Sequence, residues 1–216
     1  MALKLQRIDV MINFKIAHQS TRTIRRFEPS ARRTQFEWGS DLLRKVNTPP
    51  TPDSKDVIIR PISDSDNELQ RTFFRSLSEV SRFYRFMTPL VDIPPSIMRQ
   101  LSLLDERSHV ALLAEKSEGT EKIMIGEARC FVDAEDRATG ELGIAVHDDW
   151  QGLGVGINLL DRLEGCAANL GIKRIVADTL VENVKMLGLA ARAGYKITMS
   201  SVDPRLKRLE KILIPA

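Results

Sequence analysis

The sequence has few of the residues that mark metal sites, disulfide frameworks and membrane segments. Its 216 residues include two cysteines, Cys130 and Cys166, and three histidines that share no metal-ligand spacing. Each cysteine falls in a strand-like or helical apolar pattern, which favours buried free thiols over a disulfide or a metal site. No apolar stretch approaches the roughly 18 residues that a membrane-spanning helix needs. We therefore expect a cytoplasmic protein with no metal cofactor and no membrane partner.

The chain also has little net charge, and its basic excess is confined to one end. The formal net charge is +3, but residues 1–50 alone hold ten Lys and Arg against four Asp and Glu. A proline-rich stretch at 48–52 is typical of a linker. We expect 1–55 to be a basic, poorly ordered N-terminal extension, although a targeting or membrane-surface arm fits the same composition. No aromatic–basic platform is present, so nucleic acid is not an expected partner.

Residues 56–216 carry the apolar patterns of one folded domain. The order of predicted elements is a strand, two helices, a three-strand meander, a helix, a strand, a helix and two strands. This order predicts an α/β (α+β) fold in which helices pack on a mixed sheet. The predicted strands are 56–62, 109–116, 122–133, 141–146, 173–180, 195–202 and 208–214. The predicted helices are one with Phe73, Leu77, Val80 and Tyr84 at helical spacing, one at 96–104, one beginning near Ile157 with Gly156, Leu160, Leu163, Ala167 and Leu170 on its apolar face, and one at 183–193.

A glycine-rich hexapeptide, Gln151-Gly152-Leu153-Gly154-Val155-Gly156, lies between the strand 141–146 and the helix that begins near Ile157. The N-terminus of a helix exposes unpaired N–H groups and carries about half a positive charge. Glycines at such a position remove side chains, so that an anion can approach the backbone directly. The hexapeptide therefore predicts a phosphate or pyrophosphate site.

Three types of phosphate loop compete for this hexapeptide. A P-loop requires Gly-Lys-Ser/Thr, which is absent here. A dinucleotide-binding turn requires G-x-G-x-x-G directly after a strand, but here Gly156 comes one position early and residues 147–151 intervene. Asp178, near the end of the next strand, would imitate the acidic ribose ligand of that fold. The third pattern, Gln/Arg-x-x-Gly-x-Gly/Ala, is filled completely by Gln151, Gly154 and Gly156.

The third pattern is the acyl-CoA pyrophosphate loop of the GNAT superfamily of N-acyltransferases, which region 141–195 closely resembles. In element order the resemblance covers about residues 56–214. It implies the GNAT fold, a mixed, mostly antiparallel sheet flanked by helices. It also implies transfer of an acetyl group from acetyl-CoA to a primary amine, with the hexapeptide holding the pyrophosphate.

Two further stretches resemble members of this superfamily. Glu182-Asn183-Val184-Lys185-Met186, followed by Ala193-Gly194-Tyr195, is similar to the second cofactor segment, in which the Asn contacts the cofactor or a bound water. Asn183 equally suits a helix cap. Upstream, Leu77-Ser78-Glu79-Val80-Ser81-Arg82-Phe83-Tyr84-Arg85-Phe86 resembles bacterial protein lysine acetyltransferases of the Pat type, which also typically show the Trp-Gln-Gly found at 150–152. The resemblance implies a protein lysine as the first choice of acceptor and a small amine as the second.

Glu141 is the candidate general base. A lysine-like amine has a pKa of about 10.4, so it arrives mostly as an ammonium and must lose a proton before it attacks a thioester. Glu141 lies at the start of the strand, ten residues before Gln151, and GNAT enzymes that use a base on this strand place a Glu near that spacing. A solvent-facing glutamate at a strand end also fits the position, and Glu127 on the preceding strand is a weaker competitor.

The backbone near Val146 is the candidate oxyanion site, and the resemblance implies that the same backbone pairs with the pantetheine arm. One position departs from the family. Many members carry a tyrosine seven residues after the Asn, as the acid for the leaving thiolate, where this chain has Ala190. A thiol with a pKa of about 8.5 can leave as thiolate without full protonation. Because Ala190 replaces the tyrosine that acts as the acid in many members, the alternative function is a non-catalytic acyl-CoA-binding module.

Four arginines, Arg71, Arg75, Arg82 and Arg85, fall on the first helical region. Arg82 and Arg85 could face an acidic protein substrate. An exposed, solvated helix face is the more common arrangement for such a group.

Overall fold

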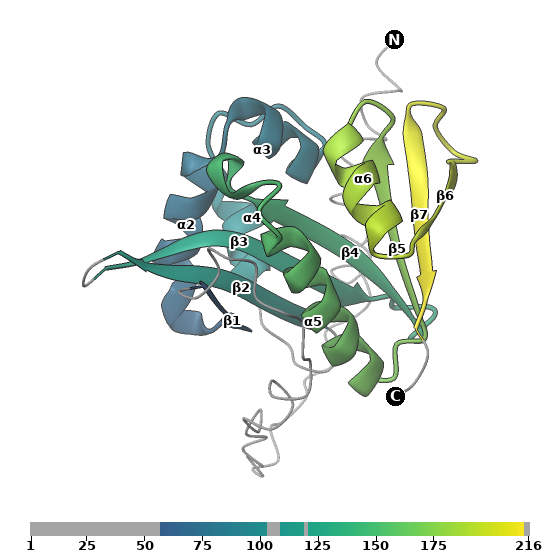
Figure 1. Ribbon diagram of the computed structural model, residues 1–216, viewed down its shortest axis with the longest axis horizontal. Helices are drawn as coiled ribbons and strands as arrows, with labels where there is room; N and C mark the ends of the chain where they lie inside the picture. Colours follow the sequence, from purple (N-terminus) through teal and green to yellow (C-terminus); the bar gives the residue numbers. More distant parts are fainter. Residues whose placement is uncertain (1–56, 103–108, 119–120, 214–216) are drawn as a thin grey trace.

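The computed structural model describes residues 57–102, 109–118 and 121–213. These residues form a seven-stranded sheet in the order β1-β2-β3-β4-β5-β7-β6, with helices on both faces (Figure 1). One of the six strand pairings, β4 with β5, is parallel and the others are antiparallel. The predicted mixed, mostly antiparallel sheet is therefore confirmed. The extension predicted at 1–55 lies outside the described residues.

All of the predicted strands are present, with ends that differ from the prediction by a few residues. The strands are β1 Val57–Pro61, β2 His109–Glu118, β3 Glu121–Val132, β4 Thr139–Val146, β5 Arg174–Leu180, β6 Lys196–Met199 and β7 Leu206–Ile212. The helices are α2 Asn67–Ser76, α3 Glu79–Phe86, α4 Pro95–Ser102, α5 Val155–Asn169 and α6 Val184–Arg192.

The first helical region contains two helices where the spacing predicted one apolar stripe. Leu77 leaves the helical conformation with ψ 144°, and Ser78 begins α3 by accepting a hydrogen bond from the N–H of Ser81. A serine in this position satisfies one of the unpaired donors of a new helix. Leu77 is buried, but Val80 is 60% exposed. The predicted stripe was wrong beyond Leu77 because it crossed a helix boundary.

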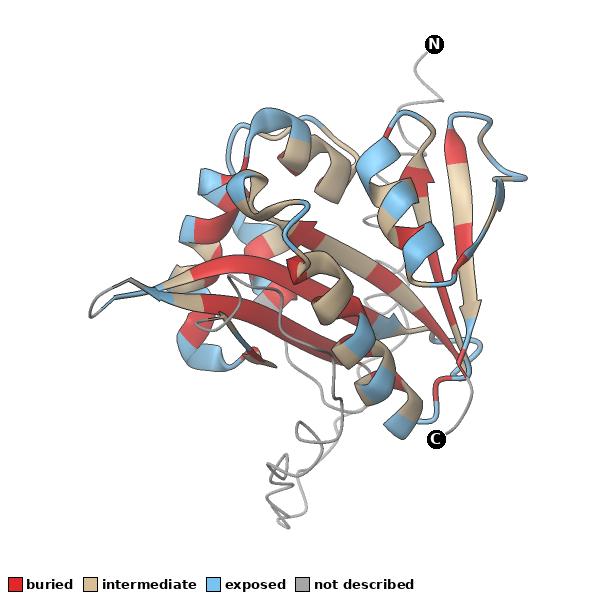
Figure 2. Ribbon diagram, viewed as in Figure 1, coloured by how far each residue is buried: buried red, intermediate tan, exposed pale blue. Residues whose placement is uncertain are grey.

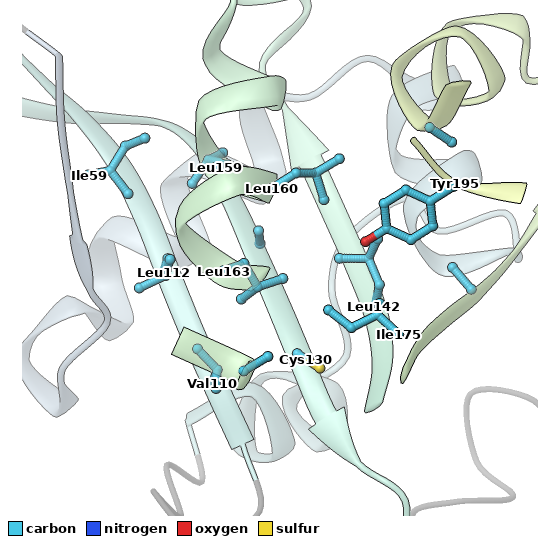
Figure 3. Close-up of a cluster of buried hydrophobic side chains, with 14 of the residues drawn as sticks. Ile59, Val110, Leu112, Cys130, Leu142, Leu159, Leu160, Leu163, Ile175 and Tyr195 are labelled. Carbon is cyan, nitrogen blue, oxygen red and sulfur yellow. The ribbon is translucent and has the colours of Figure 1, made fainter. Parts of the chain in front are cut away.

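Helix α5 covers one face of the sheet (Figure 3). Its buried side chains pack against apolar residues of β2, β3, β4 and β5, and they are Val155, Leu159, Leu160, Leu163 and Ala167. The predicted apolar face was wrong at Leu170, which follows the last helical residue and is 37% exposed. Gly171 comes next with φ 84°, a left-handed conformation that is common just after the end of a helix and that glycine adopts without strain.

Helices α2, α3 and α4 cover the opposite face with a second apolar cluster that includes Phe73, Phe74 and Phe86. Strands β2, β3 and β4 therefore carry buried residues on both faces, and these buried residues are the red bands of the central strands in Figure 2. None of the helices in the described ranges is both long and apolar enough to cross a membrane. Close packing on both faces makes the central strands a rigid support for the loops that follow them.

Both cysteines are free thiols, as predicted. Cys130 is buried, and burial raises the pKa of its thiol to about 12. Cys166 is half-buried, so it is less enclosed than expected. Within the described ranges, no group of three or more His, Cys, Asp or Glu residues is placed to hold a metal ion.

Candidate active site

The parallel strands β4 and β5 pair over a short stretch and then separate. Thr139–Glu141 pair with Arg174–Val176, and the two strands diverge beyond that point (Figure 1). Strand β4 nevertheless continues to Val146 and remains paired with β3 along that length. The edge of β4 that faces β5 therefore lacks a strand partner from Leu142 to Val146, as far as the described residues show. We call these five residues the open edge.

The backbone groups that point to the open edge follow from the pairing with β3. The carbonyl of Thr139, the first residue of β4, accepts a hydrogen bond from the N–H of Asp133, just after β3, and the N–H of His147, just after β4, donates to the carbonyl of Ile125 in β3. Alternate residues of an antiparallel strand direct their backbone groups to the same neighbour. The backbone groups of Leu142, Ile144 and Val146 therefore point away from β3. The parallel pairing of Glu141 with Val176 uses the N–H of Leu142, so an extended ligand at the open edge can pair with Ile144 and Val146.

The predicted phosphate loop follows directly. A short 3₁₀ turn at Asp148–Trp150 carries the chain from β4 to Gln151, and α5 begins at Val155, two residues earlier than expected. Gly152 and Gly154 have φ of 80° and 88°, and Gly154 is the N-cap of α5. Only glycine adopts this conformation without a steric penalty. The structure thus brings the glycines, a helix N-terminus and the open edge together.

The side chain of Gln151 joins three elements at this corner. Its Nε2 donates to the carbonyl of Val146 at 3.0 Å and to Oγ of Ser81 at 3.2 Å. Its Oε1 accepts a hydrogen bond from Nζ of Lys185 at 2.7 Å. The carbonyl of Val146 is therefore occupied, and the N–H groups of Ile144 and Val146 are the donors that the open edge presents.

Two serines of the stretch 77–86 hold the elbow that precedes the glycines. The carboxylate of Asp148 accepts hydrogen bonds from the N–H and Oγ of Ser78, at 2.9 and 2.8 Å, and from Oγ of Ser81 at 2.7 Å. Burial by itself would raise the pKa of Asp148, but these hydrogen bonds hold it below its usual range. The contact between these serines and Asp148 was not predicted from the sequence. The only sign of this contact in the sequence was a pair of serines at the start of a helix. Such a pair indicates an N-cap but does not identify a partner far away in the sequence.

Glu141 occupies the last position at which β4 and β5 pair, opposite Val176. Side chains alternate along β4, with Leu142 in the cluster under α5 and Ala145 in the cluster under α2–α4. Glu141 therefore shares the α2–α4 face with Ala145, in a half-buried position. A carboxylate at the point of strand separation can reach a substrate bound at the open edge, directly or through a water.

Glu127, the weaker competitor for the base, is fully buried between two arginines. Its Oε1 accepts from Nε and Nη2 of Arg85 at 3.0 and 2.8 Å, and its Oε2 accepts from Nε of Arg129 at 2.8 Å. Burial alone would raise the pKa of Glu127, but the charges of Arg129 and Arg85 outweigh it and lower that pKa. A carboxylate this stabilised in its ionised form is a poor proton acceptor, so Glu141 is the better placed of the two.

Arg82 and Arg85 are not on a solvated helix face, so the more common arrangement does not apply to them. Arg82 is buried and donates to the carbonyls of Leu90, Phe74 and Arg75, which fixes the ends of the neighbouring elements. Arg85 is the partner of Glu127. Arg75, by contrast, is about half exposed and pairs with Asp92. The sequence contained one indication of this buried network. Glu127 and Arg129 lie two residues apart in an apolar strand, and therefore on the same face of it.

Asn183 is a helix cap, as one of its two expected roles required. Its Oδ1 accepts from the N–H of Met186 at 3.2 Å, and its Nδ2 donates to Oγ1 of Thr179 at 3.1 Å. Ala190, in place of the family's tyrosine, is fully buried in the cluster under α5. A tyrosine side chain there would overpack the core. Position 190 therefore cannot supply an acid to the open edge in this packing.

The dinucleotide-binding alternative does not fit this fold. That alternative requires a mostly parallel, doubly wound sheet, whereas five of the six pairings here are antiparallel. Asp178, its suggested ribose ligand, pairs instead with Nη1 of Arg208 across β5 and β7 at 2.7 Å.

Comparison with known proteins agrees with this geometry. A family model described as the acetyltransferase (GNAT) domain matches residues 56–196. The chain belongs to the GNAT acetyltransferase family. It is therefore an N-acetyltransferase, and the loop 151–156 and the open edge lie inside the matched region.

Relatives of this N-acetyltransferase come from several bacteria. An acetyltransferase of Pseudomonas aeruginosa is 28% identical over 143 residues, which is 66% of this chain and 76% of that protein. The crystal structure of the GNAT domain of S. lividans PAT is also 28% identical, with a TM-score of 0.65, covering 72% of this chain and 89% of that one. The structure of yncA from Salmonella typhimurium, solved with its cofactor acetyl-CoA, is 18% identical with a TM-score of 0.56, covering 74% and 96%.

Proposed function

We propose that this N-acetyltransferase takes its acetyl group from acetyl-CoA and transfers it to a primary amine, with a protein lysine as the first choice of acceptor. One observation carries the proposal. The open edge of β4 leads directly into the glycine loop at the N-terminus of α5, and Glu141 lies where β4 and β5 separate. An extended arm with amide groups can pair with an open strand edge as another strand would.

The cofactor's pyrophosphate is assigned to the loop. Gln151, Gly152, Leu153, Gly154, Val155 and Gly156 bring backbone N–H groups and the positive end of α5 to one place. Lys185, which already contacts Gln151, adds a positive charge at the same corner. Asn183 contacts the cofactor or a bound water in addition to capping α6.

The chemistry is assigned to the open edge. The amine nitrogen attacks the thioester carbon, and the N–H of Val146 stabilises the negative charge that develops on the carbonyl oxygen. Glu141 accepts the proton of the amine through a water. The carbon–sulfur bond then breaks, and CoA leaves as a thiolate that can take up a proton from solvent, since its pKa is about 8.5.

The choice of a protein lysine rests on similarity to Pat-type enzymes. The stretch 77–86, Trp150-Gln151-Gly152 and the likeness to the GNAT domain of S. lividans PAT support it. A small amine is the second choice. We further assign the protein to the cytoplasm, in keeping with its two free thiols, and residues 1–55 to an extension of the acetyltransferase domain.

Amine-dependent release of free thiol tests this function. The purified protein is mixed with acetyl-CoA and one acceptor at a time, drawn from lysine-containing peptides, folded proteins and polyamines. The proposal expects thiol release above the hydrolytic background with at least one acceptor, and the fastest release with lysine in a peptide or protein. Release that exceeds background with polyamines alone would move the assignment to the small-amine alternative.

A pair of glycine variants tests the loop. Gly154 and Gly171 lie at opposite ends of α5 with φ of 88° and 84°, so replacing either with alanine imposes a similar backbone strain of about 1–2 kcal/mol. Only Gly154→Ala places a β carbon at the anion site. We expect it to weaken acetyl-CoA binding at least tenfold, about 1.4 kcal/mol, in calorimetric titration. Gly171→Ala should bind like the wild type, and equal affinities in the two folded variants would remove the cofactor from this loop.

A further inference from the structure

The guanidinium of Arg85 lies against β4 and has N–H groups that donate to no residue in the described structure. Arg85 uses Nε and Nη2 to hold Oε1 of Glu127. Its Nη1 makes no hydrogen bond to any of the residues that the structure describes. A guanidinium has five N–H donors, so the two on Nη1 are available to a ligand.

Gly143 places this unused nitrogen at the candidate active site. A β carbon built on Gly143 would lie 3.0 Å from Nη1 of Arg85, so the guanidinium rests directly on the backbone of β4. Gly143 is on the same face as Glu141 and two residues further along, about 7 Å at the rise of a strand. The side chain of Arg85 retains 12% exposure, so it is not sealed from solvent. A cation therefore lies over Gly143, one of the five residues of the open edge, on the same face of β4 as the candidate base Glu141.

The charge balance around Arg85 also favours an anionic ligand. Arg85 and Arg129 share a single carboxylate, that of Glu127. The other hydrogen-bond partners of Arg129 among the described residues are neutral oxygens, the carbonyl of Leu101 and Oε1 of Gln70. The three charged side chains in direct contact, Arg85, Arg129 and Glu127, thus carry a net charge of +1, which favours a further anion nearby. An anion at Nη1 would neutralise them.

We propose that Arg85 binds a carboxylate that the acceptor carries close to its accepting amine. This inference rests on the proposed function and deepens it, because it names the chemistry of the acceptor. A guanidinium forms strong, charge-assisted hydrogen bonds with a carboxylate. With Glu141 on the amine side and Arg85 on the carboxylate side, the acceptor is held in one orientation at the thioester. The carboxylate belongs either to a free amino acid or to an acidic residue beside a lysine in a protein.

Matched acceptor pairs test the proposal and distinguish the two sources. Free lysine and cadaverine differ by the α-carboxylate, and two peptides that differ in Glu or Gln beside the lysine isolate an acidic neighbour. We expect the carboxylate-bearing member of one pair to have a kcat/KM about tenfold higher or more. The pair that shows the preference identifies the source. Equal kcat/KM within both pairs contradicts the proposal and leaves the acetyltransferase function intact, whereas transfer to no amine contradicts both.

Two variants connect the preference to Arg85. Arg85→Gln should abolish the preference by lowering kcat/KM for the carboxylate-bearing acceptor alone, with its partner acceptor and acetyl-CoA affinity unchanged. Gly143→Ala, which keeps the charge but pushes on Nη1, should reduce the same preference and serves if Arg85→Gln does not fold. Arg75→Gln removes an exposed, ion-paired arginine as the matched control and should keep the full preference. A loss that is equal for both acceptors of a pair would assign Arg85 a structural role and overturn the proposal.

Discussion

Replacing Glu141 with glutamine should lower turnover by roughly 10²–10⁴ while acetyl-CoA affinity is retained. The substitution keeps the shape of the side chain but removes its ability to accept a proton. Because Glu141 lies at the point where β4 and β5 separate, the loss should fall on the chemical step. Steady-state kinetics with a saturating acceptor, together with calorimetric titration of acetyl-CoA, measures the two effects separately.

The pH profile and a control variant make the Glu141 prediction specific. The wild-type rate should rise with pH as the amine, with a pKa of about 10.4, loses its proton. Glu121→Gln makes the same change at an exposed strand residue and should leave turnover within about twofold of the wild type. Full activity in Glu141→Gln would pass the reaction to unassisted attack.

Replacing Glu127 with glutamine should destabilise the protein by about 3–5 kcal/mol. Glu127 is fully buried and is the only carboxylate that the described structure pairs with Arg85 and Arg129. Its removal leaves two positive charges together in a low-dielectric interior. Denaturant unfolding followed by circular dichroism measures the loss. Asp92→Asn, which breaks the exposed pair with Arg75, should cost far less, because a surface ion pair contributes little to stability.

The stability contributed by Glu127 should also disappear in acid. Its pKa is lower in the folded protein than in the unfolded chain because of Arg129 and Arg85. The stabilisation is therefore complete above the unfolded pKa of about 4.3 and is lost as pH falls through the folded value. As the pH is lowered from 5, the free energy of unfolding of the wild type should fall by more than that of Glu127→Gln. Parallel loss in both proteins would mean that the carboxylate is not the group responsible.

The parts of the site that are local in sequence could be predicted from the sequence. The spacing of Gln151, Gly154 and Gly156 predicted both the turn and the N-terminus of the helix that follows it. Both features depend on residues that are adjacent in the sequence. The order of strands and helices along the chain before and after the loop follows from apolar periodicity. For the same reason the position of Glu141 at the start of its strand was predictable to within two residues.

The parts that depend on strand register and helix packing could not. Arg85 and Glu127 are 42 residues apart, and only the packing of α3 on the sheet brings them together. Ser78 and Asp148 are 70 apart, so a serine that looks like an ordinary N-cap also fixes the elbow before the loop. The burial of Ala190 depends on how α6 sits on the core. Single-sequence patterns report which face of an element is apolar, but not which polar groups meet across elements.

Transfer of an isotopically labelled acetyl group tests the central claim most directly. The protein is incubated with acetyl-CoA labelled with ¹³C in the acetyl group and with the best acceptor from the panel, and the products are analysed by mass spectrometry. The account predicts that the label appears on the amine nitrogen of the acceptor in a one-to-one ratio with the free thiol released. A protein that binds acetyl-CoA but places no label on any acceptor, with thiol at the hydrolytic background, would contradict the account.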